Sequence, residues 1–460
     1  MKKILSVIIG VISSVALFAE QAKVITYPAP PTECVKSGYK VLVNGQHVDV
    51  YKATSQHFWG TDYFFCYFDF KGKIEVSVST HNRANFSEKT ELFPAREFKW
   101  TKKNVKFTAD KPFKVCLLRA ERSMPLIIFG NPIEKNIPSK DDPNVIFFDK
   151  GVHATNVISL RDNQTLYIAG GAVVKAKIDA RGDNIKIRGR GILSGELNEK
   201  WTGHLLNMFG CKNLKINGII AKDSSDWTLV VNQCQNVRIN NFKICGAKVL
   251  QDDGIDICNS SDVIIKNSFV RVQDDVIAIK GLTGTLPSEK ILVKNCILWT
   301  DCANIFRIGY ECKAEAMRNI KAEDIYVPFY SKNYAPPEHT WANAIIWFQA
   351  ANDMPMHDIT ISNMLIRSDG SDIILICANP RITDYLDTKT PGKIYNCTVK
   401  NVNVVGNKGK FKGTIFVKGY DAEHGVSNLK IENIKYFGEK ITKDSPNVRI
   451  GDFTKNIHIR

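Results

Sequence analysis

The chain has 460 residues and a formal net charge of +15, and 44% of its residues are hydrophobic. A chain of this length is usually too long for one compact hydrophobic core, so the length favours two units or an elongated repeat fold. The basic balance suits an acidic polysaccharide partner, and no nucleic-acid module or basic helix accompanies it, so we expect no nucleic-acid partner.

Residues 1–19 have the pattern of a secretory signal. Positive charges at the start precede an apolar run from Ile4 to Phe18, and small residues follow near Ala19. The run is too short for a membrane span, and no later stretch is apolar enough to be one. We therefore expect an exported protein, in the periplasm, at the cell surface or outside the cell, without a transmembrane span.

Residues 23–140 contain alternating strands joined by Asn-Gly and Lys-Gly turns, as in YKVLVNGQHVDVYKA and FDFKGKIEVSVST. Such spacing is typical of hairpins. We expect a small antiparallel β-sandwich here. We also expect it to cap the open N-terminal end of the region that follows.

Residues 141–460 repeat a short motif, a polar residue followed by alternating apolar positions. The polar positions are Asn163, Asn184, Asn213, Asn236, Asp262, Lys290, Asn319, Asp358, Asn396 and Asn428. Intervals of about 20 to 40 residues without helical periodicity predict a solenoid of strands. The sequence thus predicts an all-β protein with a right-handed parallel β-helix, in which equal positions of adjacent coils touch.

Two Asp-Asp pairs stand out in this region. Asp252 and Asp253 open QDDGIDIC, and Asp274 and Asp275 open QDDVIAIK with the apolar positions in register. Asn and Asp ladders also occupy bends of β-helices for purely structural reasons. Neighbouring carboxylates, however, repel and raise one another's pKa. A purely structural ladder would avoid this energetic cost by using Asn. We therefore expect acid–base chemistry from this group.

Aligning the strands around these pairs gives a column of polar positions. The column contains Asp226, Asp253, Asp275, Asn304, Asn343 and Asp372. We expect Asp253 and Asp275 to lie in adjacent coils and face one cleft, with Asp274 beside them.

Crowded carboxylates fit cleavage of a glycosidic bond. One protonated carboxyl gives its proton to the leaving oxygen, while ionised carboxylates activate water. Crowding of like charges separates the pKa values of the carboxyl groups, so this chemistry needs no cofactor. The chain has no Ser-His-Asp order, phosphate-binding Gly loop or metal-ligand spacing that would compete, so we expect no cofactor and no metal.

The block DDGID followed by QDDVIAIK resembles the NTDG and QDDC motifs of glycoside hydrolase family 28, the polygalacturonases. The continuation KILVKNCILWTDCANIFRIGYE is similar to family 49, the dextranases and isopullulanases, which share the β-helix and carry an N-terminal sandwich. The resemblance implies that Asp253, Asp274 and Asp275 are catalytic. It implies Asp274 as general acid, with Asp253 and Asp275 positioning water in an inverting mechanism.

The chain departs from family 28 at two motifs. It reads Ala303-Asn304-Ile305 at the GHG position and Ile346-Trp347-Phe348 at the RIK position. The Arg and Lys that would hold a galacturonate carboxylate are thus missing. Arg307, one layer from Ala278, is the nearby cation that could replace them.

Further candidates for substrate binding surround the aspartates. They are Asp252, Asp256, Trp227, Lys280, Asn304, Arg307, Tyr310 and Glu311. Sugar rings stack on aromatic faces, although most aromatic residues in such strands are core. Arg307 and Lys280 could contact substrate, tune the carboxylates or form structural ion pairs.

The sequence favours an exported polysaccharide hydrolase, a monomer, with a dextran-type α-glucan as substrate. A pectic or other acidic glycan is the alternative substrate. A non-catalytic carbohydrate-binding solenoid is an alternative of another class, but a binding protein has no need of repelling carboxylates. A lyase would need calcium or an Arg or Lys base, and neither pattern is evident.

Overall fold

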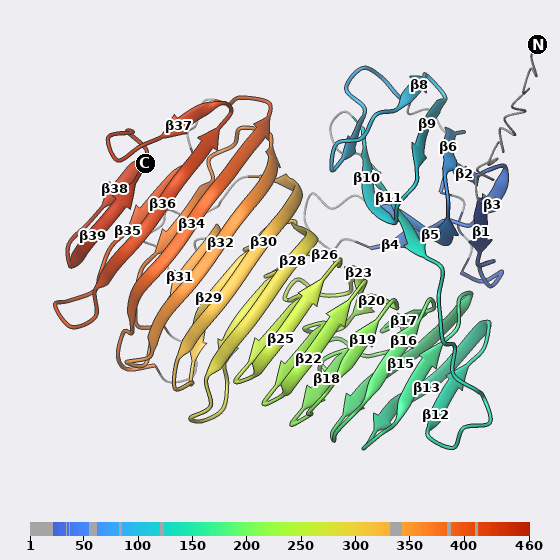
Figure 1. Ribbon diagram of the computed structural model, residues 1–460, viewed down its shortest axis with the longest axis horizontal. Helices are drawn as coiled ribbons and strands as arrows, with labels where there is room; N and C mark the ends of the chain where they lie inside the picture. Colours follow the sequence, from blue (N-terminus) through green and yellow to red (C-terminus); the bar gives the residue numbers. More distant parts are fainter. Residues whose placement is uncertain are drawn as a thin grey trace, which may run out of the picture.

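The structure, a computed structural model, describes residues 22–460 except 34, 36, 55–61, 82–84, 120–123, 332–342, 384–387 and 410–412. The predicted signal at 1–19 lies outside this part. Within it the secondary structure is entirely strand, arranged as a long coil with a smaller unit beside it (Figure 1). None of its segments is a helix long and apolar enough to cross a membrane.

The smaller unit is a sandwich of two sheets around an apolar core that includes Val41, Phe68 and Val76. One sheet contains β1 (Lys23–Thr26), β4 (Tyr51–Ala53), β5 (Tyr63–Lys71), β7 (Glu91–Phe93), β10 (Phe113–Leu118) and β11 (Leu126–Pro132). The other contains β2 (Tyr39–Val43), β3 (Gln46–Val48), β6 (Ile74–Thr80), β8 (Lys99–Thr101) and β9 (Asn104–Ala109). The expected antiparallel pairing holds except between β5 and β11, which run parallel.

The coil is a parallel β-helix, as predicted, with three faces formed by strands stacked in register. The first face contains β12 (Val145–Phe148), β14 (Thr165–Ile168), β16 (Lys186–Gly189), β19 (Lys215–Asn217), β22 (Gln235–Asn240), β25 (Ser261–Lys266) and β39 (Thr454–Ile459). The second contains β13 (Gly151–Leu160), β15 (Ala172–Ala180), β17 (Ile192–Ser194), β20 (Ile220–Ser224), β23 (Lys243–Ala247) and β26 (Phe269–Val272). Long strands continue both faces: β28 (Ser288–Thr300), β30 (Met317–Tyr330), β32 (Pro355–Ser368), β34 (Lys393–Gly406) and β36 (Val426–Tyr436).

The third face carries the Asp pairs at its entry. Its strands after β15 are β18 (Leu206–Phe209), β21 (Leu229–Asn232), β24 (Ile255–Cys258), β27 (Ile277–Gly281), β29 (Phe306–Cys312), β31 (Ala344–Gln349), β33 (Ile374–Ala378), β35 (Thr414–Val417) and β38 (Val448–Ile450). A short strand, β37 (Glu439–Ile441), pairs antiparallel with β36.

The polar positions of the repeat motif share one backbone conformation. All ten have positive φ, between 51° at Asn428 and 63° at Asn163. Asn and Asp tolerate this left-handed region better than most residues. Several also join in an amide ladder, in which Asn184 donates to Asn163 over 2.9 Å and Asn213 donates to Asn184 over 3.0 Å. The motif therefore marks the turn into the first face of each coil.

Alternation along each strand separates the core from the outer side. Ile255 and Ile257 of β24 point into the coil, where each buried Ile contributes about 1.5–3 kcal/mol. The residue between them, Asp256, points outward and aligns with Ala278 and Arg307 of the next coils. The apolar pattern thus places the polar side chains of the third face outside the coil.

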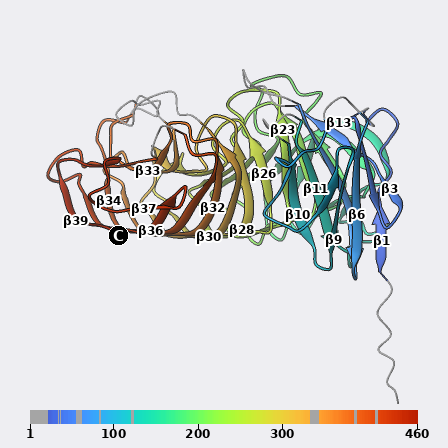
Figure 2. The ribbon, with the colours of Figure 1, turned by 90° about the horizontal axis from the view of Figure 1, so that it is seen from above.

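The sandwich packs against the flank of the coil and does not cap its end, so that expectation was wrong (Figure 2). The shared apolar cluster joins Phe65 and Phe129 of the sandwich to the second face, from Val173 of β15 to Phe329 of β30. One outward column of the second face is apolar at Val173, Ile192, Ile220, Phe269 and Ile297, and the buried Lys243 holds the equivalent position in β23. A solvent-facing sheet would not have this pattern, and the sandwich covers it.

A buried ion pair joins the two units. Arg190 Nε lies 2.8 Å from Asp69 Oδ1, and both side chains are almost completely buried. A second arginine, Arg271, lies between the rings of Tyr63 in the sandwich and Trp299 in the coil, at 4.0 and 3.9 Å from their centroids. Cation–π contacts are favourable when desolvated, so this stack also fixes the sandwich on the coil.

Candidate active site

The Asp pairs lie at the corner where the chain enters the third face. Ile255 pairs with Ile277 and Ile277 with Phe306, which aligns Asp253, Asp275 and Asn304 in adjacent coils. The rest of the predicted column is out of register.

Asp226 aligns with Asp252, because Leu229 pairs with Ile255. Beyond Asn304, the column continues to Ala344 and Ile374 rather than to Asn343 and Asp372. The connections between coils differ in length, and the apolar pattern alone did not reveal these slips.

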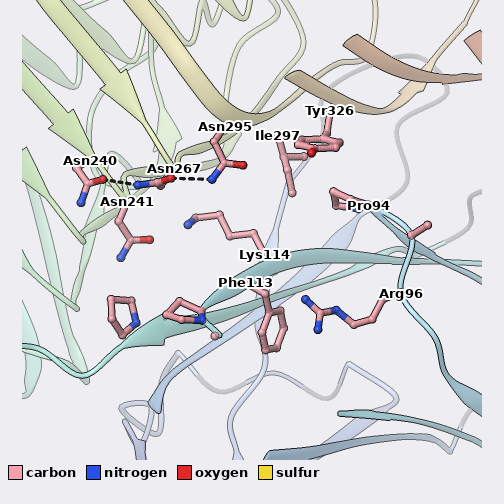
Figure 3. Close-up of a pocket in the computed structure, with 14 residues that line it drawn as sticks. Pro94, Arg96, Phe113, Lys114, Asn240, Asn241, Asn267, Asn295, Ile297 and Tyr326 are labelled. Carbon is pink, nitrogen blue, oxygen red and sulfur yellow. Dashed lines mark hydrogen bonds between the residues drawn. The ribbon is translucent and has the colours of Figure 1, made fainter. Parts of the chain in front are cut away.

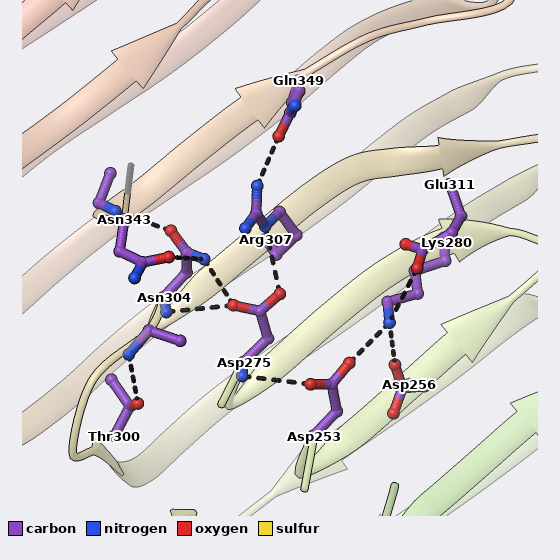
Figure 4. Close-up of polar contacts among 12 residues, drawn as sticks. Asp253, Asp256, Asp275, Lys280, Thr300, Asn304, Arg307, Glu311, Asn343 and Gln349 are labelled. Carbon is purple, nitrogen blue, oxygen red and sulfur yellow. Dashed lines mark hydrogen bonds and ion pairs between the residues drawn. The ribbon is translucent and has the colours of Figure 1, made fainter. Parts of the chain in front are cut away.

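Three carboxylates meet at this corner. Figure 4 shows two of them, those of Asp253 and Asp275, with their polar partners. Asp253, Asp274 and Asp275 each offer an oxygen within 4.8 Å of the others. The backbone amide of Asp275 also donates to Asp253 Oδ1 over 3.3 Å. The structure thus brings together the three residues that the motif resemblance implied. Three carboxylates this close together could also hold a metal ion, but basic side chains already form ion pairs with two of them.

Lys280 of β27 balances the first carboxylate. Its Nζ lies 2.6 Å from Asp253, 3.0 Å from Asp256 and 3.6 Å from Glu311. Burial would lower the pKa of Lys280, but these carboxylates outweigh it and raise the pKa well above its usual value. The face of Trp227 covers the amine, whose nitrogen lies 3.4 Å from the ring centroid. Lys280 is therefore a buried cation that serves several acids.

Arg307 and Asn304 hold the second carboxylate, that of Asp275. Asn304 donates to Asp275 Oδ1 from its backbone amide over 3.1 Å and from its side chain over 2.5 Å. Arg307 Nε donates to Asp275 Oδ2 over 3.1 Å, and its Nη1 donates to Gln349 of β31. Gln349 was not predicted. It lies within an apolar strand far along the chain and has no motif around it.

Asp274 differs from its neighbours because no cation forms an ion pair with its carboxylate in the described part of the chain. Its side chain is partly exposed. Burial and the charges of Asp253, Asp275 and Asp252 raise its pKa well above the usual 3.8. A carboxyl in these surroundings retains its proton to higher pH than an ordinary aspartate.

Asp252 lies beneath the turn that carries Asp274. Its Oδ1 accepts hydrogen bonds from the backbone amides of Gln273 and Asp274, over 2.8 and 3.1 Å. Asp252 and Asp256 are both 0% exposed. They therefore have no surface for the substrate contact that we expected, and instead hold the turn and Lys280.

The exposed part of the site is largely aromatic. Trp227 and Tyr310 are partly exposed, and Arg307 lies 5.1 Å from the Tyr310 ring centroid. His204 stacks on Trp227 with centroids 5.3 Å apart. His204 was not predicted, and burial lowers its pKa. Trp227 and Tyr310 are placed where sugar rings could stack.

The position of the family 28 RIK motif, Ile346-Trp347-Phe348, lies in β31 beside β29, which carries Arg307. Ile346 and Phe348 point into the coil core. Trp347 between them points outward, with the guanidinium carbons of Arg307 and Arg381 4.8 and 5.3 Å from its ring centroid. Arg381 was not predicted, since it lies outside the strands.

The sequence model of glycosyl hydrolases family 28 matches residues 147–299, which include all three aspartates. A probable polygalacturonase of Arabidopsis thaliana is 28% identical over 23% of this chain and 24% of its own length. Polygalacturonase-2 of Solanum lycopersicum is 31% identical over 16% of each chain. The chain thus spans a quarter or less of the length of the curated relatives that it matches.

Two solved structures share the fold over nearly the whole chain. Dex49A from Penicillium minioluteum is 15% identical with a TM-score of 0.67, and the match covers 94% of this chain and 96% of that one. The family 28 exopolygalacturonase of Yersinia enterocolitica is 14% identical with a TM-score of 0.53, over 95% and 98%. The predicted resemblance of this chain to the β-helix enzymes of glycoside hydrolase families 28 and 49 is thereby confirmed.

Proposed function

We propose that the protein is a glycoside hydrolase that cleaves O-glycosidic bonds of a polysaccharide. The family 28 match and the shared fold support this class of reaction. The observation that carries the proposal is that three adjacent carboxylates have different surroundings. Lys280 pairs with Asp253 and Arg307 pairs with Asp275, whereas the partly exposed Asp274 has a raised pKa.

This difference supports a division of roles among the three carboxyl groups. Asp274, which holds its proton, donates it to the leaving glycosidic oxygen. Asp253 and Asp275, each paired with a cation, accept hydrogen bonds from the attacking water. Removal of the proton donor should lower turnover by about 10²–10⁴.

We propose inversion at the anomeric carbon. The carboxylate oxygens lie within 4.8 Å of one another, which is closer than the roughly 6.5–9.5 Å between carboxyl groups of most inverting enzymes. Direct attack by Asp253 or Asp275 would break an ion pair, however, because both oxygens of each already accept hydrogen bonds. Attack by a water molecule leaves both ion pairs intact. Proton NMR of the first-formed anomer tests this, and a retained anomer would refute it.

A neutral α-glucan of the dextran type is the proposed substrate. Lys280 and Arg307 are both engaged by carboxylates, those of Asp253 and Asp275. The outer surface is aromatic and acidic, so a uronate there would meet repulsion. The family 28 match and the polygalacturonase relatives favour a pectic glycan as the second candidate.

Release of reducing ends from dextran, pullulan and polygalacturonan, by the parent protein and Asp274→Asn, tests activity and substrate together. We expect release from a neutral glucan and little from polygalacturonan. Strong cleavage of polygalacturonan that disappears in Arg307→Ala would overturn the substrate ranking. A folded protein that cleaves no glycan would favour the non-catalytic solenoid. The N-terminal signal pattern supports export, which secretion of the full chain would test.

A further inference from the structure

A groove of about 420 Å³ lies between the sandwich and the coil, at the corner between the first and second faces (Figure 3). It shares no lining residue with the candidate active site, which lies at the entry to the third face. The sandwich contributes Lys114 and Phe113 of β10, and the coil contributes the asparagine side chains of successive turns.

The groove is cationic. Lys114 and Arg96 line it, and no acidic residue does. Arg96 lies over the Phe113 ring, with its guanidinium carbon 4.8 Å from the centroid. Lys114 forms no hydrogen bond or ion pair with the residues that the structure describes, and burial lowers its pKa to about 8. A partly buried ammonium without a counter-ion is unfavourable, and a bound anion would remove that cost.

Amide groups face the same space. Asn295 donates to Asn267 over 2.7 Å and Asn267 donates to Asn240 over 2.9 Å, which forms a ladder along the wall. Asn241 departs from this ladder and donates to Asn131 of the sandwich over 3.1 Å. Its own Oδ1 is buried without a partner among the described residues. An unpaired buried carbonyl oxygen favours a ligand that donates a hydrogen bond, such as a hydroxyl.

We propose that this groove is a second carbohydrate-binding site that takes an acidic sugar residue. Its carboxylate or sulfate would pair with Lys114, its hydroxyls would bond to Asn241 and the amide ladder, and its apolar face would lie near Phe113. Amides, one cation and an aromatic ring are the groups that such a sugar requires. The inference is independent of the proposed hydrolysis, because no residue of the groove belongs to the active site.

Calorimetric titration of the full chain in the Asp274→Asn background tests the proposal without hydrolysis. The probes are trigalacturonate, a sulfated disaccharide and neutral isomaltotriose. Lys114→Gln should weaken binding of at least one anionic probe by about tenfold or more, and the probe affected distinguishes carboxylate from sulfate. Lys111→Gln, the same change at an exposed neighbouring position, should leave binding unchanged. Isomaltotriose should not respond to either variant.

A second variant covers the case in which Lys114→Gln does not fold. Asn267→Asp places a carboxylate in the ladder beside Lys114 and should weaken the same anionic probe to a similar extent. Aspartate is tolerated in such a ladder, because Asp324 accepts a hydrogen bond from Asn363 further along it. Anionic probes that bind a folded Lys114→Gln or Asn267→Asp protein as tightly as the parent would overturn the proposal.

Discussion

Replacement of Lys280 by methionine tests whether Lys280 favours the ionised form of Asp253. The amine lies within 3.6 Å of oxygens on Asp253, Asp256 and Glu311, and its side chain is 3% exposed. Methionine has similar length but no charge. The variant therefore leaves three acids buried without their shared cation.

Two effects should follow. Removing one partner of a buried ion pair typically destabilises a protein by about 3–5 kcal/mol, because the remaining charge is uncompensated. Burial already raises the pKa of Asp253, and Lys280 opposes that rise. Without Lys280 the pKa of Asp253 should rise further, so that Asp253 holds a proton at pH values where the parent is ionised. Loss of this base should lower turnover by about 10²–10⁴.

The measurements are urea unfolding and the pH dependence of initial rates. Lys294→Met is the matched control, because Lys294 pairs with Glu323 over 2.7 Å but is 42% exposed. Such a surface pair contributes little to stability and touches no catalytic group. The acidic limb of the rate profile should move to higher pH in Lys280→Met alone. A Lys280→Met protein with the rates and pH profile of the control would refute the reasoning.

Three further outcomes are expected. Asp274→Asn should melt near the parent temperature while turnover falls by about 10²–10⁴; equal rates would move the acid role elsewhere. Because the pKa of Asp274 is raised, parent activity should persist above pH 3.8 and fall as pH rises through that raised value, and a rate that climbs steadily into alkali would contradict this. Arg190→Met should lower the free energy of unfolding by about 3–5 kcal/mol, whereas Lys140→Met, at an exposed pair, should change it little, as measured by urea titration.

The repeat positions could be predicted because their cause is local. Asn163 and Asn428 are far apart in the chain, yet both occupy the left-handed turn before the first face. The apolar alternation of DGIDIC and DVIAIK likewise aligned Asp253 with Asp275, since the pairs lie one coil apart. These features depend on short segments, so sequence patterns report them.

Other features depend on contacts between distant segments. Asn343 is out of register because Phe306 pairs with Ile346 and not with Ile345, and apolar positions alone cannot specify that shift. Gln349 binds Arg307 across adjacent coils, and nothing around it in the sequence marks a polar site. The place of the sandwich depends on apolar residues that face outward from the second face. A pattern of buried positions does not tell which unit buries them.

The lateral position of the sandwich has a consequence for how the molecule unfolds. A solenoid on its own is held by contacts between neighbours, so its coils can open one after another. Here one apolar cluster ties Val173 of β15 to Phe329 of β30, and Leu365 of β32 packs at its edge. Opening any of these coils requires the sandwich to detach, so they should exchange their amide hydrogens together and slowly. The coils built from β34 to β39 lack that brace in the described structure, and their amides should exchange first, in separate steps.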